Sequence, residues 1–155
     1  MLNEGDKAPD FALPGDKDQI IQLSQHLGRP VVVYFYPKDD TSGCTAQAKD
    51  FSCQLSAFAA AGADIIGISP DSARSHDKFK LKHELTLTLA SDEEKAVVAA
   101  YGVWVEKAMY GRKYMGVDRS TFLIDAKGRI AKIWRKVKVP GHVDEVLDAV
   151  KALKS

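Results

Sequence analysis

The chain has 155 residues, which suits a single domain spanning residues 1–155 with a substantial buried core. Its 22 lysines and arginines nearly balance 21 acidic residues, so the net charge of +1 provides no general attraction to nucleic acid or to an anionic membrane. The N-terminus has no apolar signal-peptide core, and no apolar run approaches the ~20 residues of a membrane-spanning helix. Two cysteines make no disulfide framework. We therefore expect a soluble cytoplasmic protein.

The first predicted element is an N-terminal β-hairpin. Residues 10–13 and 19–23 are short extended candidates, and Pro14-Gly15-Asp16 between them is a strong turn signal. Residues 24–27 predict one helical turn, which ends before the next strand at Gly28-Arg29-Pro30.

A buried strand followed by a helix forms the centre of the predicted fold. Residues 31–36 are β-branched or aromatic and are stopped by Pro37, as in a strand covered on both faces. Thr41, Ser42 and Gly43 are typical of a helix start, and we expect the helix to end near Gly62. Its apolar face carries Cys44, Ala48, Phe51, Leu55 and Phe58. Cys44 is therefore expected in the first helical turn, where unpaired backbone N–H groups and the helix dipole favour a thiolate.

The remaining elements complete a mixed sheet. Residues 63–69 predict a second buried strand, parallel to the first because a helix intervenes. Helices are expected over 72–83 and, from a capping box at Ser91 and Glu94, through residue 100 or 101, with a short strand at 87–90. A loop with a hairpin is expected at 101–115, an antiparallel strand pair at 117–124 and 130–137, and a C-terminal helix after Pro140-Gly141. The order indicates an α/β fold with a central mixed β-sheet and helices on both faces.

The stretch around Cys44 resembles a known family. Pro37, Thr41 and Cys44 fit the Pro-x-x-x-Thr-x-x-Cys pattern of the peroxiredoxins, and residues 34–45 resemble the bacterioferritin comigratory protein or peroxiredoxin Q subgroup. Further matches lie at 67–72, 101–104 and 119–125, so the resemblance covers nearly the whole chain. It implies a thioredoxin-like fold and a thiol-dependent peroxidase that reduces hydrogen peroxide and organic hydroperoxides, as an antioxidant enzyme of cell redox homeostasis.

The predicted catalytic residues are Cys44, Thr41, Arg119 and Pro37, with no cofactor and no metal. The Cys44 thiolate attacks one peroxide oxygen and becomes a sulfenic acid, while fixed donors stabilise the charge on the departing oxygen. Thr41 lies three residues before Cys44 and can place its hydroxyl beside the sulfur, and Pro37 would shape the pocket. Arg119 matches the family's active-site arginine, a role that the resemblance alone implies.

Cys53 is the second cysteine, and its position argues against an intramolecular disulfide. Nine residues of helix place it ~13 Å beyond Cys44, whereas a disulfide requires Cα atoms within ~7 Å. The positions where the subgroup carries a resolving cysteine hold Lys49 or fall in residues 72–83, which contain no cysteine. We therefore expect a one-cysteine cycle completed by glutathione, glutaredoxin or thioredoxin, and a structural role for Cys53. The subgroup resemblance favours a monomer.

Other features have simpler interpretations. His26, His76, His83 and His142 show no metal-ligand spacing, and we expect His76 and His83 to share an exposed helix face. Nine basic residues within 112–138 could contact nucleic acid, but protection of a sheet edge is the favoured interpretation. Core packing is the expected use of most of a group of large side chains, with a pocket wall or contact surface as alternatives: Trp104, Met109, Tyr110, Tyr114 and Met115.

Three other functions are weighed against the peroxidase. A disulfide reductase needs a Cys-x-x-Cys pair, but Thr45, Ala46 and Gln47 follow Cys44, and a copper carrier needs a cysteine where Ala48 stands. The main rival is a redox-responsive binding or holdase protein in which oxidation of Cys44 alters a partner surface.

Overall fold

Strand β3 (Val31–Phe35) is the central strand of the fold, in a computed structural model that describes residues 2–15 and 19–153. All five residues are buried, as expected for a β-branched and aromatic run. Val31, Val33 and Phe35 face one core cluster, while Val32 and Tyr34 face the other. The predicted strand therefore separates two apolar layers.

Four further strands complete the main sheet in the order β5-β4-β3-β8-β9. β3 pairs in parallel with β4 (Asp64–Ser69), which pairs in parallel with β5 (Thr88–Ser91). On its other side β3 pairs antiparallel with β8 (Ser120–Ile124), and β8 with β9 (Ile130–Trp134). The predicted mixed sheet and the antiparallel pair are confirmed.

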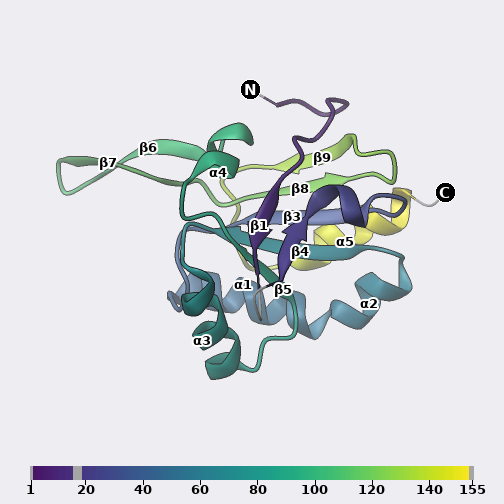
Figure 1. Cartoon of the computed structure of the whole chain (residues 1–155), viewed down its shortest axis with the longest axis horizontal. Coiled ribbons are helices and arrows are strands. Elements are labelled where there is room, and N and C mark those ends of the chain that lie inside the picture. Colours follow the sequence, from purple (N-terminus) through teal and green to yellow (C-terminus); the bar gives the residue numbers. More distant parts are fainter. Residues whose placement is uncertain (1, 16–18, 154–155) are drawn as a thin grey trace.

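Helices cover both faces of this sheet (Figure 1). One face packs against α1 (Ser42–Cys53), α2 (Leu55–Ala60), α3 (Ala73–His83) and α5 (His142–Leu153). The other packs against α4 (Ala96–Ala100) and the hairpin of β1 (Ala12–Pro14) and β2 (Ile20–Gln22). The helix expected to run from the Cys44 turn to Gly62 is two helices, because the chain leaves helical geometry at Gln54.

The N-terminal hairpin and the helical turn after it are confirmed. β1 and β2 pair antiparallel, and a 3-10 helix spans Leu23–His26. Of the predicted turn, Asp16 lies outside the described residues.

The capping box predicted at Ser91 and Glu94 is wrong. Ser91 is the last residue of β5, and its hydroxyl donates to the Asp71 carbonyl. The helix begins later, at Ala96, after Lys95 in left-handed geometry with a φ of 64°. The Asp92 carboxylate accepts the N–H of Val98 at 2.8 Å, so an aspartate outside the helix satisfies this donor.

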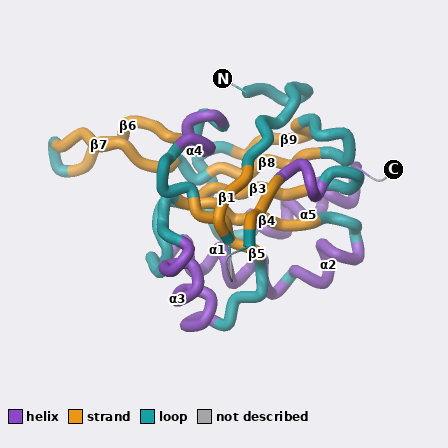
Figure 2. The backbone as a smooth tube through the Cα atoms, viewed as in Figure 1, coloured by secondary structure: helices purple, strands orange, loops and turns teal. Residues whose placement is uncertain are grey.

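A second hairpin projects from the body of the molecule (Figure 2). β6 (Trp104–Met109) and β7 (Arg112–Val117) pair antiparallel, and Tyr110 and Gly111 between them have φ of 52° and 78°. Two consecutive left-handed residues make a type I′ turn, which matches the twist of the strands. The hairpin expected within residues 101–115 is confirmed and extends to Val117.

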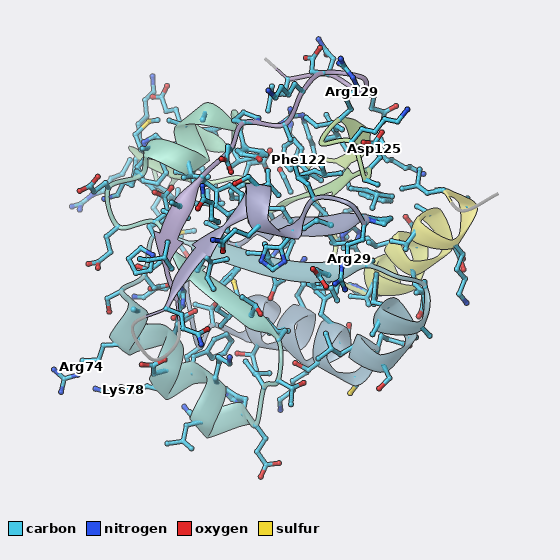
Figure 3. The ribbon with its side chains drawn as sticks, turned by 45° about the vertical axis from the view of Figure 1, so that its right-hand side comes forward. Arg29, Arg74, Lys78, Phe122, Asp125 and Arg129 are labelled. Atoms are coloured by element: carbon cyan, nitrogen blue, oxygen red, sulfur yellow. The ribbon has the colours of Figure 1, made fainter. Side chains whose placement is uncertain are left out.

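β9 forms one edge of the main sheet, as the charge distribution predicts for the strand that carries Lys132. The N-terminal segment covers its start, since the Gly5 N–H bonds to the Ile130 carbonyl and the Ile130 N–H to the Asp6 carbonyl. Figure 3 shows Asp125 and Arg129 at the turn that leads into this strand. Among the described residues, no helix has the length and apolar content to cross a membrane.

Candidate active site

Cys44 is the third residue of α1 and so lies in the first helical turn, as predicted. Thr41 is the N-cap residue in extended geometry, and the Thr45 N–H makes a helical bond to its carbonyl at 2.8 Å. The N–H groups that precede Thr45 have no partner within the helix and face its start. Cys44 is only 2% exposed, so the sulfur lies in a nearly closed site where charge interactions are strong.

Arg119 lies against this sulfur although 75 positions separate the two residues. Its Nη2 donates to Cys44 Sγ at 3.2 Å, and its Nη1 donates to Gln47 Oε1 at 2.6 Å. The contact follows from sheet register: Phe35 pairs with Ser120, so the residue before β8 lies beside the loop that leaves β3. A Cβ on Gly43 would lie 3.2 Å from Nη2, so glycine at this position lets the guanidinium approach the helix start.

Gln47 and Tyr34 join the site without having been predicted. Gln47 is fully buried, and its Oε1 is the acceptor that fixes the second arm of Arg119. Its position three residues after Cys44, on the same helical face, is the sequence signal that could have found it. Its Nε2 and the hydroxyl of buried Tyr34 have no hydrogen-bond partner among the described residues. Burial, and then the charge of nearby Cys44, raises the pKa of Tyr34, which remains a neutral phenol.

Thr41 and Pro37 lie on the loop that joins β3 to α1. The Thr41 hydroxyl donates to the Lys38 carbonyl at 2.9 Å, so its proton is directed into the loop and its oxygen is left as an acceptor. Pro37 is half-buried directly after Tyr36. The structure thus brings Arg119 to the sulfur, and places the other two predicted residues on the loop that precedes it.

Cys53 is exposed at the far end of α1 and does not pack in the core. Both cysteines are free thiols. α1 is continuous from Ser42 to Cys53, and nine residues at ~1.5 Å each separate the two cysteines by ~13 Å along the axis.

The expectation of an exposed face shared by His76 and His83 is wrong. His76 is 1% exposed and lies 2.7 Å from an oxygen of Asp39, whereas the more accessible His83 bonds to Asp40. Within the described residues, Asp39, Asp71 and His76 bring three potential ligand atoms within 4.8 Å of one another. His142 is buried against Thr121, and its pKa is lowered to about 4 chiefly by burial.

Most of the large side chains of residues 104–115 do not pack in the core. Only Trp104 packs partly against a core cluster. The other four are exposed on the projecting hairpin: Met109, Tyr110, Tyr114 and Met115. These four side chains form an exposed surface instead of packing in the core, because a two-stranded hairpin that stands away from the body has no second layer to cover it.

The sequence and fold match known proteins over almost the whole length. The model of the AhpC/TSA family matches residues 4–133. Peroxiredoxin Bcp of Bacillus subtilis is 50% identical over 147 residues, covering 95% of this chain and 94% of that protein, and a putative peroxiredoxin bcp of Coxiella burnetii is 48% identical over 146 residues, covering 94% and 97%.

Solved structures agree with these sequence matches. A cysteine-to-serine mutant of Xylella fastidiosa PrxQ superposes with a TM-score of 0.94 at 38% identity, covering 100% of this chain and 99% of the other. The Xanthomonas campestris bacterioferritin comigratory protein gives a TM-score of 0.89 at 43% identity, covering 94% and 92%. The chain therefore belongs to the AhpC/TSA family and is a peroxiredoxin of the Bcp or peroxiredoxin Q group.

Proposed function

We propose that this peroxiredoxin reduces hydrogen peroxide and small organic hydroperoxides through Cys44. The observation that carries the proposal is the 3.2 Å contact between Arg119 Nη2 and Cys44 Sγ at the start of α1. A guanidinium and helix N–H groups both favour a thiolate, the form of cysteine that acts as a nucleophile. An alkyl peroxide reduction activity is described for the similar Xanthomonas campestris bacterioferritin comigratory protein, which supports an organic substrate here.

The reaction is a displacement at oxygen. The sulfur anion attacks one oxygen of the O–O bond, a new S–O bond forms, and the other oxygen leaves with the bonding electron pair as hydroxide or alkoxide. The sulfur is oxidised to a sulfenic acid, the peroxide is reduced, and a proton from solvent converts the leaving group to water or an alcohol. Charge therefore moves from sulfur to the departing oxygen.

The proposed roles follow from this shift of charge. Arg119 stabilises the thiolate and then the departing oxygen, and its second arm on Gln47 keeps it in place. The Thr41 oxygen is free to accept a hydrogen bond from the O–H of the bound peroxide, because its own proton is directed to the Lys38 carbonyl. Pro37, half-buried at the start of the same loop, limits access of water to the sulfur.

We further propose a one-cysteine cycle. The continuous helix between Cys44 and Cys53 argues against a disulfide between them, because the bond would require several turns of α1 to unfold. An external thiol would instead condense with the sulfenic acid, releasing water and forming a mixed disulfide. A second thiol would then restore Cys44. Glutathione, glutaredoxin or thioredoxin would supply these thiols to a monomeric, single-domain enzyme.

Peroxide consumption measured by stopped flow tests the first proposal. Wild type and Cys53→Ser are expected to consume hydrogen peroxide at similar rates, while Cys44→Ser is expected to lose the reaction. Consumption by Cys44→Ser at the wild-type rate would contradict the assignment.

Intact-protein mass spectrometry tests the cycle. After one equivalent of peroxide and addition of glutathione, we expect a glutathione adduct on Cys44. A Cys44–Cys53 disulfide within one chain as the main product would refute the one-cysteine cycle and leave the peroxidase assignment untouched.

A second candidate function is a redox-responsive binding or holdase activity. The exposed methionine and tyrosine side chains of the β6–β7 hairpin favour it, since a contact surface of this kind can adapt to several partners. It predicts that oxidised wild type, but not Cys44→Ser, suppresses aggregation of an unfolding client protein. Equal suppression by both proteins would exclude this function.

A further inference from the structure

A buried cluster of polar side chains lies beside the loop that leads to Cys44. Asp39, on that loop, is 7% exposed, and His76, on α3, is 1% exposed. Asp39 accepts hydrogen bonds from Tyr36 Oη at 2.6 Å and from Ser75 Oγ at 2.8 Å, and His76 Nδ1 lies 2.7 Å from its second oxygen. The reaction described above uses none of these contacts.

Both ring nitrogens of His76 have a hydrogen-bond partner. His76 Nε2 lies 3.0 Å from the Ala90 carbonyl, which can only accept, so this nitrogen carries a proton. Tyr36 and Ser75 donate to the two Asp39 oxygens, and Nδ1 of His76 completes the hydrogen bonds around this carboxyl group. Burial, and then the charges of Tyr34 and Asp39, raise the pKa of Tyr36, which keeps its hydroxyl a donor.

Hydrogen bonding, and not a shared metal ion, explains the short distance between His76 Nδ1 and the Asp39 oxygen. Two ligands about 2.1 Å from one tetrahedral zinc would be about 3.4 Å apart, farther than the 2.7 Å between His76 and Asp39. The third member, Asp71, is satisfied by the hydroxyl of Ser69 at 2.7 Å and by the N–H of Asp39 at 2.8 Å. The cluster is therefore closed as a hydrogen-bonded unit.

This unit fixes the loop to three other parts of the fold. Through His76 the loop is joined to α3 and to Ala90 on β5, and through Asp71 to the end of β4. The next residue, Asp40, has a left-handed φ of 61° and adds exposed contacts to α3 through Lys82 and His83, both at 2.7 Å. Figure 3 shows Arg74 and Lys78, on the same helix, pointing away from the body.

The geometry points to the Asp39–His76 pair as a positioning device for the reaction at Cys44. By holding Asp39, the pair fixes the path of residues 37–41. That path determines the positions of the Thr41 oxygen and of the first N–H groups of α1. This inference rests on the proposed peroxidase function. His76 does not touch the sulfur, and it affects the peroxide reaction only through the position of the loop. A displacement of ~1 Å at reacting groups can cost about 100-fold in rate.

The test compares two reactions of the same thiol in His76→Gln and His76→Ala. Reaction with hydrogen peroxide needs aligned donors and acceptors, whereas alkylation by iodoacetamide needs only an ionised, reachable sulfur. We expect the peroxide rate constant to fall about 10- to 100-fold, with the alkylation rate within about threefold of wild type. Leu81→Ala, at a side chain of the same helix that is 83% exposed, serves as the matched control and is expected to change neither rate.

A variant that leaves Asp39 unpaired risks failing to fold, so the double variant Asp39→Asn with His76→Gln is made as well. It keeps a neutral hydrogen-bonded pair, and we expect it to recover part of the peroxide rate lost in His76→Gln. Peroxide and alkylation rates that fall together, or a folded His76 variant with both rates unchanged, would overturn the positioning role. If wild type reacts no faster with peroxide than Cys44→Ser, the proposed function fails and this role fails with it.

Discussion

Replacement of Arg119 by methionine tests the contact on which the site depends. The change keeps a long side chain and removes two hydrogen bonds, one to Cys44 Sγ at 3.2 Å and one to Gln47 Oε1 at 2.6 Å. Hydrogen bonds to charged groups contribute about 1.5–3 kcal/mol. If the Sγ bond acts in the transition state, its loss slows the reaction by about 10- to 150-fold.

The bond from Arg119 to Gln47 affects the stability of the fold and not the reaction directly. Gln47 is fully buried and its Nε2 has no partner among the described residues, so Arg119→Met leaves both ends of its amide unsatisfied. We expect the free energy of unfolding to fall by about 1–3 kcal/mol. Arg119→Lys keeps the charge but offers one point donor in place of a fork, so its rate should lie between those of wild type and Arg119→Met.

Stopped-flow kinetics with hydrogen peroxide and urea unfolding measure the two effects separately. Arg112→Met removes the same charge from the exposed hairpin and is the matched control, expected to leave the rate within about twofold because surface charges contribute little. A folded Arg119→Met protein with a rate within about threefold of wild type would refute the reasoning. The bond to sulfur would then be structural only.

Three further predictions concern stability. Gly67→Ala places a Cβ 2.7 Å from Tyr34 Cζ and 2.8 Å from Leu89 Cδ2, so the free energy of unfolding in urea should fall by about 1–3 kcal/mol, and an unchanged midpoint would contradict the close packing. The pKa of His142 is lowered to about 4, so below pH ~6.5 the histidine is protonated in the unfolded state but stays neutral in the folded state. The free energy of unfolding in urea should therefore fall between pH ~6.5 and pH ~4, and it should fall less steeply in His142→Gln. Tyr110→Asn suits the left-handed φ of 52° and should slow amide exchange across β6 and β7, whereas faster exchange would argue against a type I′ turn.

The failures of sequence-based prediction occur where side-chain partners come from other elements. Ser91 and Glu94 fit a capping box, yet Ser91 is held in β5 by the Asp71 carbonyl and the helix begins at Ala96. His76 looks like a surface residue of a charged helix until the loop after β3 brings Asp39 against it. Core packing was expected for most of the large side chains of residues 104–115, but Met109 and Tyr110 are exposed. Their exposure depends on how far the hairpin stands from the sheet, which the local sequence does not show.

Local pattern alone was sufficient for the strand at 31–35, the helix that begins just before Cys44, the parallel β4 and the antiparallel β8–β9 pair. Apolar periodicity and turn residues act over a few positions, so they can be read from the sequence. The contact of Arg119 with the sulfur and its support by Gln47 depended on tertiary structure. The pairing of Phe35 with Ser120 sets that contact, and strand register between segments 85 positions apart is fixed by the packing of the whole sheet and not by either segment alone.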